Sequence, residues 1–263
     1  CSSFSMAGNR EKDWGKEKKF REGQAEQVLD NLFFDFIDLA KELQPKVVVA
    51  ENVAGMMMGE AKQYVRKVYD SFLNAGYQLR VEPYLLDASK MGVPQKRKRV
   101  FFIALRNDLA NQFMEQIDMF QTAPKLDLEF NEKPILFGEV RSENGKKSSA
   151  NRADLMQFRI KSDKCMSDIN QRKYKKNSGF NAMIRHDDEV CGTITAGETD
   201  WRYYDGDACS DYDYKVCGSY PLDYNFMTKA ESGAKYMIGM SVPPVMTAQI
   251  SSRIYEQWLN ILK

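Results

Sequence analysis

The pattern of apolar and polar positions divides the first hundred residues into alternating helices and strands. Apolar residues recur every three or four positions in the stretches predicted as helices, and they form short β-branched or aromatic runs in those predicted as strands. The predicted helices are 24–43, 59–75 and 245–259, and the predicted strands are 46–50, 77–86 and 99–105. Alternating helices and strands predict an α/β fold with a mostly parallel sheet that is covered on both faces.

The composition changes after about residue 108. The whole chain has a net charge of only +1, so it carries no global signal for nucleic acid. Between residues 125 and 185, however, fourteen basic residues stand against eight acidic ones in a segment rich in Ser, Asn and Gly. We interpret this segment as a second, smaller lobe with a basic surface.

The remaining bulk properties exclude several classes of protein. No apolar stretch is long enough to span a membrane, and the start of the chain has no signal-peptide pattern. The five cysteines are irregularly spaced and form no metal-type pair, so we predict no metal site and expect a reducing, cytoplasmic setting. The chain starts at Cys1, which suggests a processed or partly represented polypeptide.

Three short motifs carry the candidate chemistry. In chain order they are Cys1-Ser2-Ser3-Phe4-Ser5, Glu51-Asn52-Val53 and Gln95-Lys96-Arg97-Lys98-Arg99. At these separations they resemble the catalytic part of the DNA cytosine-5 methyltransferase family. Three further blocks extend the resemblance, namely Thr193-Ile194-Thr195-Ala196-Gly197, Tyr220-Pro221-Leu222-Asp223-Tyr224 and Gly239-Met240-Ser241-Val242-Pro243-Pro244.

The resemblance implies a role for each residue of these motifs. The Cys1 thiolate would attack C6 of a cytosine swung out of the duplex, and the Glu51 carboxyl would hydrogen-bond N3 and the exocyclic amine. Arg99 would reach the cytosine O2, while Arg97 would organise the pocket and its Glu. Because Arg97 and Arg99 are two residues apart in a predicted strand, we expect them to share one face. The predicted supporting residues are Asn52, Val53 and Gln95.

The resemblance also implies a fold, a cofactor and a substrate. The fold would be part of a Rossmann-like methyltransferase sheet with a smaller, basic DNA-recognition domain. The predicted division is a catalytic part at 1–108, a target-recognition domain at 109–189 and a return to the catalytic domain at 190–263. The substrate would be double-stranded DNA, and the predicted DNA contacts are Lys146, Lys147, Arg172, Lys173, Lys175, Lys176 and Arg185.

The cofactor implied by the resemblance is S-adenosylmethionine. Ser241 and Val242 would help to line its methionine end, although Met240 stands where the family normally has Asn. The family's glycine-rich cofactor motif should precede the Cys, so we expect it on a part absent from this sequence, and a separate chain is one candidate. The family type suggests a bacterial or phage-encoded modification enzyme.

Other functions remain open at this point. The chain could be a DNA-binding subunit or remnant without activity of its own. An N-terminal nucleophile hydrolase using Cys1 would need stacked antiparallel sheets, which the predicted elements contradict. An RNA-directed relative of the family would carry the same motifs, and the sizeable basic insert favours DNA instead. The single histidine, His186, lies in a charged stretch and is predicted to be on the surface.

Overall fold

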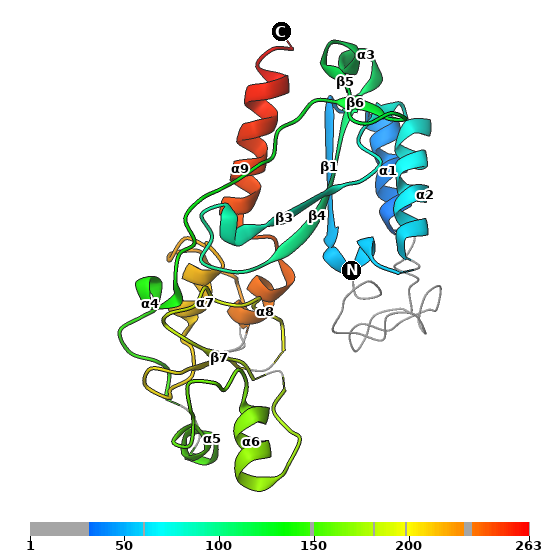
Figure 1. Ribbon diagram of the computed structural model, residues 1–263. Coiled ribbons are helices and arrows are strands. Elements are labelled where there is room, and N and C mark those ends of the chain that lie inside the picture. Colours follow the sequence, from blue (N-terminus) through cyan, green and yellow to red (C-terminus); the bar gives the residue numbers. More distant parts are fainter. Residues whose placement is uncertain are drawn as a thin grey trace. The chain divides into compact units, whose positions relative to one another are not determined.

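The computed structural model describes residues 32–59, 61–147, 150–180, 182–197, 199–228 and 233–262 (Figure 1). Contacts divide the chain into two compact units. The first comprises Cys1–Leu86, Lys98–Leu128 and Arg253–Lys263, and the second comprises Asp87–Arg97 and Glu129–Ser252. These units group the chain by contact rather than by motif, and the predicted division at 108 and 189 stays a prediction.

The sheet of the first unit is built around one central strand. Its strands are β1 (Val47–Val53), β2 (Tyr77–Gln78), β3 (Tyr84–Asp87) and β4 (Lys98–Arg106). β4 lies between β1 and β2 and also pairs with β3. Its residues from 100 to 105 are all buried, as expected for a strand that is covered on both faces.

The prediction of a mostly parallel sheet is wrong for the described strands. β4 runs antiparallel to both β1 and β2, so β1 and β2 run in the same direction without being neighbours. Helix α2 (Ala61–Asn74) provides the long crossover that two parallel strands need. The return from β2 to β4 contains no long helix, so the chain re-enters the sheet in the opposite direction and separates the parallel pair.

Two helices cover one face of this sheet. Helix α1 (Leu32–Leu43) and α2 pack beside one another (Figure 1). Ile37 and Ala40 of α1, Val68 and Phe72 of α2, and alternate residues of β1 and β4 form one buried cluster. The two predicted helices are confirmed over Leu32–Leu43 and Ala61–Asn74, while residues 24–31 of the first prediction lie outside the described residues. Helix α2 ends as expected before Gly76, whose φ of +90° favours glycine.

Short elements complete the first unit. They are α3 (Asn107–Ala110), the hairpin β5 (Met114–Gln116) and β6 (Thr122–Pro124), and a π-helical turn at Tyr255–Leu259 that continues helix α9 (Pro244–Ile254). Trp258 is buried, and its indole Nε1 donates a hydrogen bond of 2.6 Å to the Lys125 carbonyl. The predicted C-terminal helix is confirmed, and its last turn belongs to the first unit.

The second unit has little regular structure. Its helices are α4 (Phe137–Val140), α5 (Ala150–Met156), α6 (Met166–Tyr174), α7 (Asp211–Cys217) and α8 (Gly233–Met240), and its strands β7 (Ile184–Arg185) and β8 (Trp201–Arg202) form a two-residue parallel pair. Buried ion pairs supplement its small apolar core. Arg185 with Asp200 and Arg202 with Asp213 have side chains at most 5% exposed.

Candidate active site

Glu51 and Arg99 form an ion pair across the β1–β4 ladder. Glu51 is paired in register with Phe101, and Arg99 is paired with Val53. Residues directly opposite in an antiparallel ladder share a face, as do residues two apart in one strand, so all four side chains project from the same face. Glu51 and Arg99 are diagonal neighbours on it, and the Arg99 Nε lies 2.9 Å from the Glu51 Oε1.

This ion pair is partly open to solvent. The side chain of Glu51 is 26% exposed and that of Arg99 is 14% exposed. Burial lowers the pKa of the Arg99 guanidinium, and the Glu51 carboxylate opposes that effect by its charge and hydrogen bond. The guanidinium nevertheless stays protonated at any working pH, because its ordinary pKa is far above neutrality. The strands therefore present a carboxyl and a fixed cation side by side, both within reach of a ligand.

The neighbours of Glu51 in its motif support the strand. Asn52 is buried, and its side-chain oxygen accepts a hydrogen bond of 2.9 Å from the backbone N–H of Val53. Glu51 was predicted at the end of a short strand, but β1 continues to Val53 and holds Glu51 within the ladder. The backbone of Glu51 is therefore held by pairing with β4 at the residues before and after it in β1.

Arg97 has surroundings that differ from those of Arg99. Its side chain is buried in the second unit, where it donates hydrogen bonds of 2.9 Å to the Ile194 carbonyl and 2.8 Å to the Gly239 carbonyl. β4 begins only at Lys98, so the expectation that Arg97 and Arg99 share one strand face is wrong. The role predicted for Arg97 toward Glu51 stays a prediction, and its hydrogen bonds connect the main chain at Ile194 with that at Gly239.

Gln95 joins the same buried network. Its amide Nε2 donates to the Cys217 carbonyl, while its Oε1 accepts a hydrogen bond from the Ile194 N–H. Gly239 lies so close to the chain that a Cβ there would be 2.5 Å from the Ala196 nitrogen. We call this set, Gln95, Arg97, Ile194 and Gly239, the arginine hub. It joins three of the sequence blocks through main-chain contacts.

The predicted DNA contacts fall into three groups. Lys146, Lys175 and Lys176 are exposed, and Lys175 ends α6 in the left-handed conformation, with φ of 57°. Lys147, Arg172 and Lys173 are exposed but engaged within the unit: Lys147 pairs with Asp207, Arg172 pairs with Asp163, and Lys173 lies 3.5 Å from the centre of the Phe158 ring. Arg185 is buried against Asp200, so its prediction as a DNA contact is corrected to a structural role.

Two further predictions concern Cys1 and His186. Cys1 lies outside the described residues, so its predicted role stays a prediction. His186 was predicted on the surface but is only 3% exposed, stacked on Tyr203 at 4.6 Å, with its Nε2 2.7 Å from the Asp163 carbonyl oxygen. The charged residues that follow His186 misled the prediction, because His186 comes directly after the buried strand β7. Among the described residues no cluster of His, Cys, Asp or Glu could hold a metal ion.

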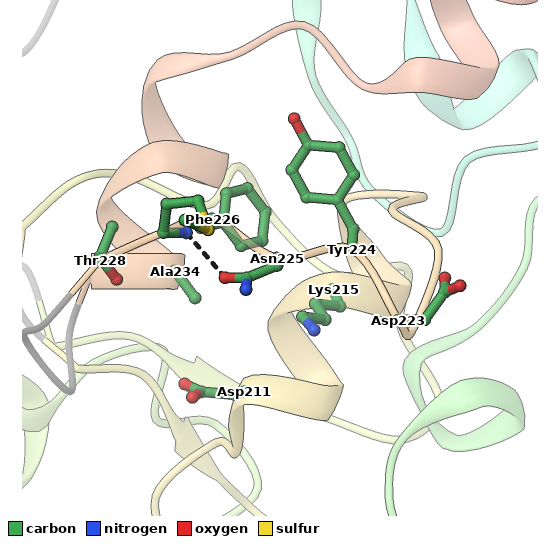
Figure 2. Close-up of a pocket in the computed structure, with 9 residues that line it drawn as sticks. Asp211, Lys215, Asp223, Tyr224, Asn225, Phe226, Thr228 and Ala234 are labelled. Carbon is green, nitrogen blue, oxygen red and sulfur yellow. Dashed lines mark hydrogen bonds between the residues drawn. The ribbon is translucent and has the colours of Figure 1, made fainter.

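A hollow of about 380 Å³ lies elsewhere, in the second unit. Figure 2 shows its lining, which comprises Asp211 and Lys215 of α7, residues 223–228 and Ala234 of α8. Part of the wall is held locally, since the Asn225 side-chain oxygen accepts a hydrogen bond from the Met227 N–H (Figure 2). None of the predicted site residues lines it, so it is not the candidate active site.

A comparison with known protein families identifies the family of this chain. The model of the C-5 cytosine-specific DNA methylase family matches residues 1–256 of the 263. The chain belongs to this family. The Glu51–Arg99 ion pair joins the Glu51-Asn52-Val53 block to the Gln95-to-Arg99 block, both of which lie within the matched range.

The curated relatives of this chain include bacterial and phage methyltransferases. Type II methyltransferase M.Eco47II of Escherichia coli is 39% identical over 111 residues, which are 42% of this chain and 24% of the relative. Type II methyltransferase M.DdeI of Desulfomicrobium norvegicum is 38% identical over 111 residues, and orphan methyltransferase M.Rho11sI of Bacillus phage rho11s is 37% identical over 109. The matched part spans about a quarter or less of each relative's length, so the activity, substrate and partners of this methylase are proposals.

Solved structures support the same α/β fold. A prophage-encoded DNA modification methyltransferase of Escherichia coli superposes with a TM-score of 0.60 at 18% identity, covering 88% of this chain and 74% of that one. A variant of Spodoptera frugiperda DNMT2 gives a TM-score of 0.58 at 13% identity, covering 97% and 76%. At these identities the likeness shows the fold alone. No helix in the described ranges has the length and apolar character needed to cross a bilayer.

Members of the family normally use S-adenosylmethionine, and the binding of this cofactor by the present chain is a proposal. Ser241, predicted to line that site, donates its hydroxyl hydrogen bond to the Ile238 carbonyl at the end of α8. Val242 is half-buried beside it. The described residues also contain no Gly-x-Gly-x-x-Gly turn between a strand and a helix, the usual cradle for an adenosine-containing cofactor. The predicted roles of Ser241 and Val242 stay predictions.

Proposed function

We propose that this methylase acts on C5 of a cytosine that has been swung out of duplex DNA. Unpairing and unstacking a base costs a few kcal/mol, which contacts in the pocket must offset. The observation that carries the proposal is the Glu51–Arg99 ion pair, which places a carboxyl and a cation on one open strand face. S-adenosylmethionine would supply the methyl group.

In this proposal the two paired side chains hold opposite parts of the cytosine ring. The Cys1 thiolate adds to C6, which pushes electron density toward N3 and makes C5 a nucleophile. A proton on the Glu51 carboxyl, shared with N3, offsets that negative charge, and the guanidinium of Arg99 binds the O2 oxygen. When C5 has been methylated, loss of its hydrogen as a proton expels the thiolate and restores the aromatic ring.

A second function has one observation in its favour. The described residues contain no Gly-x-Gly-x-x-Gly turn between a strand and a helix, so in this second candidate the chain is a DNA-binding subunit that requires a separate cofactor-binding chain. The exposed Lys146, Lys175 and Lys176 provide its candidate phosphate contacts.

Covalent trapping on duplex DNA containing 5-fluorocytosine separates these functions. Fluorine at C5 cannot leave as a cation, so after methyl transfer the enzyme stays bonded to the base. With S-adenosylmethionine present, methylation by this chain predicts an adduct that Cys1→Ser abolishes and Glu51→Gln strongly slows. DNA that migrates more slowly in a gel with the protein but forms no covalent adduct would reject methylation by this chain alone. That result would favour the DNA-binding subunit.

A further inference from the structure

Three buried cysteines lie together in the apolar core of the second unit. Cys191, Cys209 and Cys217 have at most 4% of their surface exposed and belong to one cluster. All three are free thiols, and the reaction proposed above uses none of them. A single buried thiol packs as a small apolar side chain. Two of these three, however, are placed as a pair.

The pair is Cys191 and Cys217, and Gln95 holds the main chain of both. Cys191 forms a parallel bridge with Gln95, and its carbonyl accepts a hydrogen bond of 2.8 Å from the Lys96 N–H. Cys217 ends α7, and its carbonyl accepts a hydrogen bond of 3.0 Å from the Gln95 side-chain amide. Because Gln95 is only 1% exposed, these contacts are shielded from water. The two cysteines are therefore held close together, although they are far apart in the chain.

The two side chains also contact one another. The Cys217 thiol donates a hydrogen bond to the Cys191 sulfur, which lowers the pKa of Cys191 and raises the pKa of Cys217. The positive charge of Arg185 lowers the pKa of Cys191 further, and its guanidinium lies beside this turn, since a Cβ on Gly192 would be 2.5 Å from its Nη1. Burial instead raises the pKa of the third thiol, Cys209. Of the three thiols, Cys191 is thus the one whose thiolate form is most favoured.

We propose that Cys191 and Cys217 form a reversible disulfide bond when the folded chain reacts with hydrogen peroxide, an oxidant small enough to enter a packed core. The Cys191 thiolate attacks one peroxide oxygen, which breaks the O–O bond, forms a sulfenic acid and releases hydroxide. The Cys217 sulfur then attacks the sulfenic sulfur and displaces its hydroxyl group, which leaves with the Cys217 proton as water. The first hydroxide takes up the proton that Cys191 had lost. Two thiols are thereby oxidised to one disulfide, and one peroxide is reduced to two waters.

This disulfide cross-links two segments that meet at the arginine hub. Cys191 precedes Ile194 by three residues, Cys217 ends α7, and Gln95 of the hub contacts both segments. A cross-link between distant residues restricts the unfolded chain and so stabilises the folded one. The oxidised chain should therefore unfold at a higher temperature than the reduced chain. Neither DNA nor S-adenosylmethionine takes part, so the result is independent of the proposed function.

The test maps disulfides in the full chain carrying Cys1→Ser, so that only thiols of the described residues can react. The folded chain is treated with hydrogen peroxide, catalase removes the excess, and the remaining thiols are alkylated in denaturant. Trypsin places the three buried cysteines on separate peptides, 186–202, 203–215 and 216–229. We expect 186–202 linked to 216–229, with a mass two hydrogens below their sum. The unfolding temperature should rise by about 5 °C or more, and dithiothreitol should reverse both changes.

The matched control is Cys209→Ala, which removes a thiol from the same core and should leave the link and the rise in unfolding temperature intact. Cys217→Ala should abolish both. Three results with the parent chain would overturn the proposal. They are recovery of Cys191 and Cys217 as alkylated thiols after peroxide treatment, a link from either one to another cysteine, and conversion of Cys191 to a sulfinic or sulfonic acid without a link.

Discussion

Two arginines that are two residues apart in the chain belong to different units and have different surroundings. Arg97 is buried and donates to two carbonyls of the arginine hub, whereas Arg99 is paired with Glu51 on a partly open strand face. A buried guanidinium that donates hydrogen bonds to main-chain oxygens stabilises the fold. One that shares a face with a carboxylate and remains within reach of a ligand can take part in chemistry.

The comparison teaches that similar motif residues can have separable roles. If Arg97 holds the second unit and Arg99 holds the substrate, the two substitutions should affect different measurements. Loss of Arg97 should reduce stability, while loss of Arg99 should reduce reactivity in a protein that still folds.

The largest loss of stability is expected from Arg97→Met. The substitution leaves the Ile194 and Gly239 carbonyls without this donor, and each unsatisfied buried group costs about 1–3 kcal/mol. The free energy of unfolding in urea should fall by about 3 kcal/mol or more. Arg99→Met, which removes a partly exposed ion pair, should cost about 1 kcal/mol or less. Equal losses from both substitutions would break the comparison.

Glu51→Gln should act on reactivity and leave stability almost unchanged. The amide keeps the size of the side chain and can still accept from Arg99, but it cannot donate an acidic proton to N3. Loss of a general acid slows a reaction by about 100-fold or more. The rate of covalent trapping on 5-fluorocytosine DNA measures this, and an unchanged rate would remove Glu51 from the mechanism.

Gly239→Ala tests whether the hub depends on close main-chain packing. The new Cβ would lie 2.5 Å from the Ala196 nitrogen and 2.6 Å from the Thr195 carbonyl carbon, so the backbone must move. Overpacking of this kind costs about 1–3 kcal/mol. Gly197→Ala is the matched control, because its nearest neighbour would be a side-chain oxygen at 3.6 Å. Equal melting temperatures for the two variants would show that the hub tolerates expansion.

The smallest effect is expected from the exposed lysines after α6. Lys175→Ala and Lys176→Ala should each weaken DNA binding a few-fold and reduce the salt dependence of the affinity by about one counterion, since each removes one phosphate contact. Titrations at two or more salt concentrations check this. Lys161→Ala is a control, because Lys161 is already paired with Asp188. Affinities that do not change would place the DNA on another surface.

Local patterns predicted the elements better than they predicted their pairing. The spacing of apolar residues indicated α1, α2, α9 and the buried strand β4, because each buries a periodic face. The direction of β4 could not be predicted in this way, since it depends on which strand becomes its neighbour after the chain returns from β2. The sheet is therefore more antiparallel than the sequence suggested.

The candidate site shows the same limit. The two-residue spacing of Arg97 and Arg99 suggested one face, but β4 begins between them, at Lys98, and the hydrogen bonds of Arg97 go to carbonyls far along the chain. A main-chain carbonyl can accept a hydrogen bond whatever its residue type, so the arginine hub could not be predicted from the identity of its residues. Arg185 and His186 were misjudged for a related reason, because their burial depends on distant partners.

The central claim is that Arg99 holds the cytosine while Arg97 holds the fold. The most direct measurement is the release of tritium from C5 of cytosine in duplex DNA, which reports thiolate addition to C6 without requiring a methyl donor. It would be compared for Arg97→Lys and Arg99→Lys, each corrected for its folded fraction. The claim predicts release near the wild-type rate for Arg97→Lys and at least a tenfold loss for Arg99→Lys. Equal rates in the two variants, or a loss confined to Arg97→Lys, would contradict it.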